Sequence, residues 1–211
     1  MLKADIAESS NALVTAHEPK LQSRRGNDRT LAVYRLVKVE HEADQGLARC
    51  RNISDGGMKL HLSIPLNLND RITITMSSAE LNGRVVWLNG SECGIAFEEP
   101  VDCARLLNGA TENGAAPATR GPRLTTNLHA KIAYEGGACE ALVNDISVRG
   151  MKIANDGNFQ PGLKVRVILD NGFEKEGVVR WSRDNIAGVL LLEPFDVEEL
   201  GSVQRLCRPS A

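Results

Sequence analysis

An arginine pair near the start of the chain has the residue type and spacing needed to hold an anion. The segment Arg25-Gly-Asn-Asp-Arg29 places two arginines four residues apart, directly after Arg24. A planar guanidinium donates two parallel hydrogen bonds to a phosphate, so two of them can clasp one anionic ligand. A basic run is also typical of a solvated surface, so the pair alone is weak evidence for a site.

A second motif follows 23 residues after Arg29, as Asn52-Ile-Ser54-Asp-Gly-Gly57. Short Asn and Ser side chains at a tight turn can hydrogen-bond the polar edge of a planar ring, and glycine lets another group approach the backbone. The same composition fits an ordinary β-turn in which Asn bonds its own backbone. Each motif is therefore evidence for a ligand site only in combination with the other, and only if the fold brings the two together.

The scaffold is a duplicated unit. The stretch RNISDGGMKL at residues 51–60 returns as NDISVRGMKI at 144–153, and GRVVWLNGSECGIAFEEPVD at 83–102 returns as GVVRWSRDNIAGVLLLEPFD at 177–196. Order and spacing are both kept, which indicates two copies of one domain. Gly, Ala, Pro and polar residues dominate between the copies and predict a flexible linker. We predict a flexible tail over 1–21, a first domain over 22–108, a linker over 109–119 and a second domain over 120–208.

Each copy has the pattern of a small β-barrel. Short runs of alternating apolar and polar residues, separated by Gly, Asn and Asp, predict five to six strands per copy. Closing them into a barrel removes exposed edges. A short helix is expected after each barrel, at 101–109 and 196–207, with Asp102 and Asp196 as N-caps and an apolar side on its own barrel. Trp87 and Trp181 lie in apolar strands and are expected in the cores.

The two motifs, at this interval and within a barrel pattern, resemble the PilZ family of bacterial receptors for cyclic di-GMP. That family combines Arg-x-x-x-Arg with a later Asp/Asn-x-Ser-x-x-Gly, and the Gly-x-Val-Val-Trp strand is similar too. The resemblance implies a mainly all-β fold of two six-stranded antiparallel barrels, each followed by a short C-terminal helix. It also implies that arginines clasp phosphates and guanines, while the turn holds a guanine edge. The implied ligand-binding residues are Arg24, Arg25, Arg29, Asn52, Ser54 and Gly57. Arg51 is left out, because strand alternation directs its side chain away from Asn52.

The second copy departs from this pattern in its arginines. Its turn is intact, but Thr119 stands where the first arginine is required, Arg120 is misplaced by one residue, and Arg123 is matched to Arg29. The sequence therefore predicts, at most, a weak second site formed by Arg120, Arg123, Asp145, Ser147 and Gly150.

Other classes of function are less favoured. The net charge is −2 and aromatic residues make up 4% of the chain, which argues against a nucleic-acid-binding barrel with stacking platforms. Five cysteines without a Cys-x-x-Cys pair predict reduced thiols and no metal site or cofactor. No catalytic triad, paired carboxylates or phosphate loop is evident, so an enzyme is not expected. The start of the chain has no signal-peptide pattern and no apolar run could span a bilayer, so we expect a cytoplasmic protein without membrane insertion.

The function expected from the sequence is that of a cyclic di-GMP receptor or adaptor. We expect the ligand to order the N-terminal arginine segment and thereby signal to a protein effector whose identity the sequence does not give. The alternative is a PilZ-like interaction adaptor that does not bind nucleotide.

Overall fold

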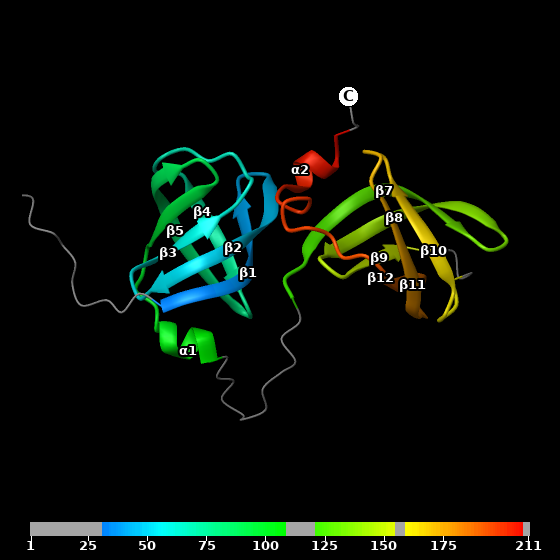
Figure 1. Cartoon of the computed structure of the whole chain (residues 1–211), viewed down its shortest axis with the longest axis horizontal. Helices are drawn as coiled ribbons and strands as arrows, with labels where there is room; N and C mark the ends of the chain where they lie inside the picture. The colour runs from blue at the N-terminus through cyan, green and yellow to red at the C-terminus, as the bar shows by residue number, and fades with distance from the viewer. Residues whose placement is uncertain (1–30, 109–120, 155–158, 209–211) are drawn as a thin grey trace, which may run out of the picture.

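The computed structural model describes residues 31–108, 121–154 and 159–208, which form two closed antiparallel β-barrels (Figure 1). The strand order in the first barrel is β1-β2-β3-β6-β5-β4, and β4 pairs back onto β1 to close it. The prediction of two six-stranded barrels is confirmed. The strands of the first barrel are β1 (Leu31–His41), β2 (Asp44–Ser54), β3 (Gly57–His61), β4 (Arg71–Met76), β5 (Ala79–Asn89) and β6 (Glu92–Phe97).

The second barrel repeats this topology, in the order β10-β11-β12-β9-β8-β7. In both barrels the residues that face inward are aliphatic, as the alternation predicts, and they are almost fully buried. The strands are β7 (Leu124–Tyr134), β8 (Gly137–Ser147), β9 (Gly150–Ala154), β10 (Lys164–Leu169), β11 (Glu174–Arg183) and β12 (Ile186–Leu191).

Helix α1 (Cys103–Asn108) follows the first barrel as predicted. The Asp102 carboxylate accepts a hydrogen bond from the Arg105 backbone N–H at 2.9 Å, which confirms Asp102 as the N-cap. At the other end, the Arg35 guanidinium donates to the Leu107 carbonyl at 2.7 Å. Arg35 on β1 therefore connects α1 to the barrel.

Helix α2 (Val203–Leu206) begins later than predicted, although its buried residue Leu206 lies in the core of its own barrel as expected. It begins seven residues after Asp196, and its N-cap is Ser202, whose side chain accepts from the Arg205 backbone N–H. Asp196 is therefore not its N-cap. The helix lies between the two barrels, where the Asp44 carboxylate of the first barrel accepts from Ser202 Oγ at 2.6 Å and from the Gln204 N–H at 3.0 Å (Figure 1).

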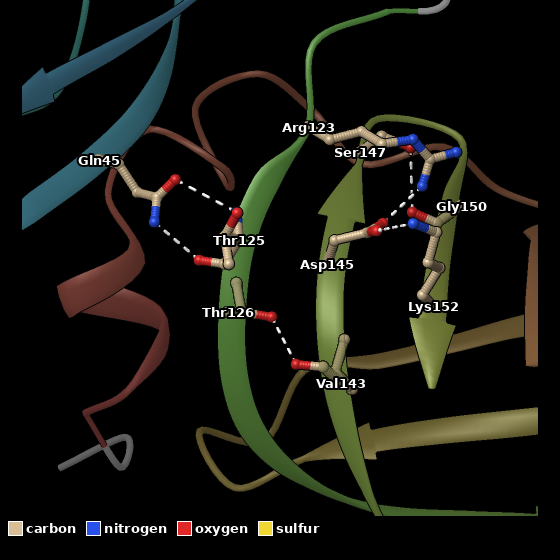
Figure 2. A network of polar contacts seen from close by, with 9 residues as sticks. All are labelled: Gln45, Arg123, Thr125, Thr126, Val143, Asp145, Ser147, Gly150 and Lys152. Atoms are coloured by element: carbon tan, nitrogen blue, oxygen red, sulfur yellow. Dashed lines mark hydrogen bonds and ion pairs between the residues drawn. The ribbon is translucent and has the colours of Figure 1, made fainter. Parts of the chain in front are cut away.

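The two barrels meet along a contact that we call the seam, formed by residues 44–49 of the first barrel with residues 198–204 and Thr125 of the second. Leu47 is 1% exposed and belongs to the hydrophobic core of the second barrel, although it lies on β2. Its N–H donates to the Leu200 carbonyl at 2.8 Å. The Gln45 side-chain amide makes two hydrogen bonds to the Thr125 backbone, at 2.7 and 3.2 Å (Figure 2). The predicted tail and linker lie outside the described residues, but the barrels are joined by direct contacts.

Candidate functional site

A bulge in β2 brings two polar side chains to the outer face of the first barrel. Cys50 pairs with Leu60 and Asn52 pairs with Lys59, so the register shifts at Arg51. Cys50 and Ile53 are buried, whereas Arg51 and Asn52 between them are both partly exposed. A bulge breaks the alternation of a strand and redirects its side chains. The argument that excluded Arg51 is therefore wrong.

Asn52 begins a row of paired residues that crosses four strands of the first barrel. Asn52 on β2 pairs with Lys59 on β3, Lys59 with Gly94 on β6, and Gly94 with Trp87 on β5. A Cβ on Gly94 would meet the Trp87 ring at 1.9 Å, so the missing side chain gives the indole its place on the barrel wall. Trp87 is 39% exposed. The expected core position of this tryptophan is therefore wrong.

The turn after Asn52 is held by the barrel and by α1. The Ser54 hydroxyl donates to the Gly57 carbonyl across the turn, at 3.4 Å. A Cβ on Gly57 would stand 2.2 Å from the Ile95 carbonyl oxygen, so the approach of β6 alone requires glycine here. The Asp55 carboxylate accepts from the Cys103 N–H at 3.1 Å, which connects the turn to the first residue of α1.

Two cations lie beside Asn52. Lys59 Nζ pairs with Glu92 at 2.7 Å, and the hydrogen bond from Lys59 lowers the pKa of the Glu92 carboxyl. The Arg51 guanidinium lies 5.5 Å from the ring centroid of Tyr34, which is 81% exposed. Asn52 makes no side-chain hydrogen bond to any residue in the described ranges, so its amide can serve a ligand.

The second barrel carries the same row with a different charge. Asp145 pairs with Lys152, Lys152 with Gly188, and Gly188 with Trp181. The Asp145 carboxylate binds Arg123 at 2.5 Å through one oxygen and Lys152 at 2.9 Å through the other (Figure 2). Asp145 therefore holds two cations, where its counterpart Asn52 holds none.

The turn of the second barrel is closed by the equivalent hydrogen bond. The Ser147 hydroxyl donates to the Gly150 carbonyl at 3.0 Å (Figure 2). A Cβ on Gly150 would stand 2.6 Å from the Val189 carbonyl oxygen. Asp145, Ser147 and Gly150 thus lie together as the motif implies.

The arginine segments are described only in part. Arg24, Arg25, Arg29 and Arg120 lie outside the described residues. Leu31 pairs with Ile53 and Leu124 pairs with Ile146, which fixes the correspondence between the two copies. By that register Arg123, which directly precedes Leu124, corresponds to position 30 rather than to Arg29. In the sequence, the last arginine before the first strand therefore stands one residue closer to that strand in the second copy than in the first.

Three side chains next to the motif were not selected from the sequence: Arg51, Lys59 and Trp87. The repeat could have indicated two of these side chains. Lys59 recurs as Lys152 within the repeated GMK segment, and Trp87 recurs as Trp181 in the second repeated segment. Recurrence on an outward face suggests a shared role at the site. No sequence pattern predicted the bulge that exposes Arg51.

Within the described ranges, no group of three or more His, Cys, Asp or Glu side chains is placed to hold a metal ion. Cys50, Cys93 and Cys103 are buried and free, and burial raises the pKa of Cys50 and Cys93 to about 11. Among the described residues, no helix has the length and apolar character needed to cross a membrane.

Comparison with known proteins identifies the class to which these barrels belong. The PilZ domain matches residues 23–108 and again residues 119–208, so the chain belongs to the PilZ family. No curated protein matches it significantly.

The solved structures that match the chain share little sequence with it. PlzA of Borreliella burgdorferi, solved with c-di-GMP, is 12% identical, with a TM-score of 0.35 over 85% of this chain and 93% of that one. The Bacillus subtilis inhibitor of motility MotI (DgrA) is 17% identical, with a TM-score of 0.33 over 79% and 90%. MrkH of K. pneumonia in complex with c-di-GMP is 12% identical, with a TM-score of 0.30 over 78% and 80%.

Proposed function

We propose that this protein is a receptor for cyclic di-GMP and that the first barrel holds the ligand. The observation that carries the proposal is the outward Asn52, whose amide makes no hydrogen bond to a described residue and which lies between Arg51 and Lys59 on the barrel wall. Asn52 also pairs with Ala32, three residues after Arg29 in the chain. Membership of the PilZ family and the c-di-GMP bound to PlzA and MrkH support the choice of ligand.

The chemistry of the site suits this ligand. A cyclic dinucleotide offers two phosphates and two guanines, and arginine can bind either group in a planar fork. Arg25 and Arg29 clasp phosphate and guanine, with Arg24 as a further stacking group. The Asn52 amide has both a donor and an acceptor for a guanine edge, and the Ser54 oxygen keeps lone pairs free to accept. Arg51 adds a cation at the side of the same turn.

In this proposal, ligand binding affects two other parts of the protein. The ligand bridges the segment 24–29 to the Asn52 turn and so changes the surface that a protein effector meets. The turn is also bonded to α1 through Asp55 and Cys103, so a shift of the turn reaches the helix. The alternative function, an adaptor that acts through protein contacts without nucleotide, keeps the same surfaces but needs no ligand.

Calorimetric titration of the full chain with cyclic di-GMP tests the proposal. We expect saturable binding in the micromolar range, about −8 kcal/mol. Arg29→Ala removes a charge-assisted contact of about 1.5–3 kcal/mol and should weaken binding by about ten- to a hundredfold. The matched control is Arg71→Ala, which removes an arginine that is 72% exposed on β4 and lies outside the row.

Trypsin gives a second readout, because Arg24, Arg25 and Arg29 are themselves cleavage sites. Saturating ligand should slow cleavage at these three residues. Full-strength binding by the Arg25→Ala, Arg29→Ala double variant would refute the site. The absence of any binding by the unmodified protein would favour the nucleotide-free adaptor.

A further inference from the structure

The second barrel has a strongly basic cavity on its outer face. The cavity measures about 200 Å³ and four cations line it: Arg123, Arg149, Lys152 and Arg180. No Asp or Glu is among its lining residues. A concave surface lined by one sign of charge concentrates ions of the opposite sign.

Two of these cations are placed there by backbone features of the barrel. Arg149 lies in the turn between β8 and β9, and its carbonyl accepts from the Leu191 N–H at 3.0 Å, which fixes the turn. Arg180 lies at the β11 bulge, where the register shifts between Val179 and Trp181. The bulge makes Arg180 and Trp181 consecutive residues that both face outward.

The first barrel has the same backbone features without these cations. The residues equivalent to Arg149 and Arg180 are Gly56 and Val86, and Val86 is 53% exposed at the matching β5 bulge. Only Lys59 is retained, as the counterpart of Lys152. The two additional arginines are therefore specific to the second barrel, and the architecture of the fold does not require them.

Neither additional arginine is neutralised by the protein. Arg149 and Arg180 are exposed and form no ion pair with any described carboxylate. Asp145 is already shared by Arg123 and Lys152. The cations around the cavity repel one another, and a bound anion relieves that repulsion.

We propose that this cavity binds the phosphate of a small nucleotide through Arg149 and Arg180, without reading the base as guanine. Both Asp145 oxygens hold cations and its side chain is only 14% exposed, so its carboxylate is not offered to a guanine edge. The Ser147 hydroxyl proton is directed at the Gly150 carbonyl. Trp181 and Leu190 line the same cavity with outward side chains and provide an apolar wall for the sugar or base, which free phosphate would not use.

The chain offers a reporter for this site, because it contains two tryptophans, one in each barrel. In the full-length Trp87→Phe protein, the emission of Trp181 reports on the cavity that it lines. We expect AMP and GMP to bind saturably, with dissociation constants within about threefold of each other, and inorganic phosphate to bind more weakly. If Trp181 emission does not respond to binding, calorimetry on the same protein measures the same dissociation constants.

The Arg149→Ala, Arg180→Ala double variant should bind AMP and GMP at least about tenfold more weakly. The corresponding lysine substitutions retain the positive charge and should retain most of the affinity. Unchanged affinity in the double alanine variant would refute the site. GMP binding more than about tenfold tighter than AMP would refute recognition without base reading. Inorganic phosphate binding as tightly as the nucleotides would refute the assignment to a nucleotide.

The proposal is independent of ligand binding by the first barrel, and the two can fail separately. In the Trp181→Phe protein the remaining Trp87 reports on the first barrel, and its response to cyclic di-GMP tests the proposed function. A response there with no binding of AMP or GMP in the Trp87→Phe protein would refute only the present inference. The reverse result would refute only the proposed function.

Discussion

Leu47→Ala should destabilise a barrel to which Leu47 does not belong in sequence. The residue lies on β2 of the first barrel, yet it is 1% exposed and packs in the core of the second. Its neighbour Gly46 has no room for a side chain, because a Cβ there would meet the Gly201 carbonyl oxygen at 2.0 Å. The seam is thus closely packed at the level of the backbone, and the space left by a shortened side chain cannot be filled by a small shift.

The expected cost follows from the burial. Burying a leucine side chain contributes about 1.5–3 kcal/mol, and the cavity left by truncation to alanine adds to the loss. Leucine-to-alanine changes in cores cost about 2–5 kcal/mol, so we expect about 3 kcal/mol here. That loss should appear in the free energy of unfolding of the second barrel.

Urea unfolding of the two single-tryptophan proteins separates the barrels. With a slope of about 1.5 kcal/mol per molar, a loss of about 3 kcal/mol lowers the midpoint reported by Trp181 by about 2 M. The matched control is Leu192→Ala, which truncates a leucine of the same barrel that is 59% exposed. It should change the free energy of unfolding by less than about 0.5 kcal/mol.

Two results would refute this reasoning. A Trp181 midpoint that moves no more in Leu47→Ala than in the control would show that the seam does not form in solution. A shift confined to the Trp87 signal would show that Leu47 stabilises only the first barrel.

Two further predictions follow from the described contacts. Gly57→Ala should lower the free energy of unfolding of the first barrel by about 1–3 kcal/mol, because the new Cβ would stand 2.2 Å from the Ile95 carbonyl oxygen. A variant that loses cyclic di-GMP binding but keeps its free energy of unfolding would contradict this. A thiol reagent at pH 8 should modify exposed Cys207 well before Cys103, whose pKa is raised to about 12 chiefly by burial, as mass spectrometry of timed samples would show; equal rates would contradict it.

The barrels could be predicted because their determinants are local. Alternation of apolar residues and the Gly, Asn and Asp turns fix the strands, and the repeat shows the same pattern twice. The bulges were not predictable in this way. At Arg51 the register depends on which β3 residue each β2 residue pairs with, and the residue types at 50–52 do not set that pairing. Trp87 was misplaced for the same reason, because the β5 bulge directs it outward.

The position of α2 shows a second limit of sequence reasoning. Both copies continue past a Pro-x-Asp segment, which suggested equivalent helices with Asp102 and Asp196 as caps. Asp102 does cap α1, but the chain after Asp196 first runs along the seam, where the Leu200 carbonyl accepts from the Leu47 N–H of the first barrel, and α2 begins only at Val203. The decisive partner is Asp44, which is 158 residues away from Ser202. A contact of that separation leaves no periodic signal in either segment.

The two copies distribute their positive charge differently, and under the two proposals this difference determines how each barrel would select a ligand. The first barrel has a neutral Asn52 with Arg51 and Lys59 beside it, and in the proposed function the arginines that precede β1 supply further positive charge. The second barrel lacks one of those arginines but carries Arg149 and Arg180 on the wall, and its Asp145 is neutralised internally. A free amide can discriminate between bases by donating and accepting, whereas a carboxylate engaged with two cations cannot. In the two proposals, the exchange of Asn52 for Asp145 at one position of a shared row would therefore separate a site that reads a base from a site that reads charge.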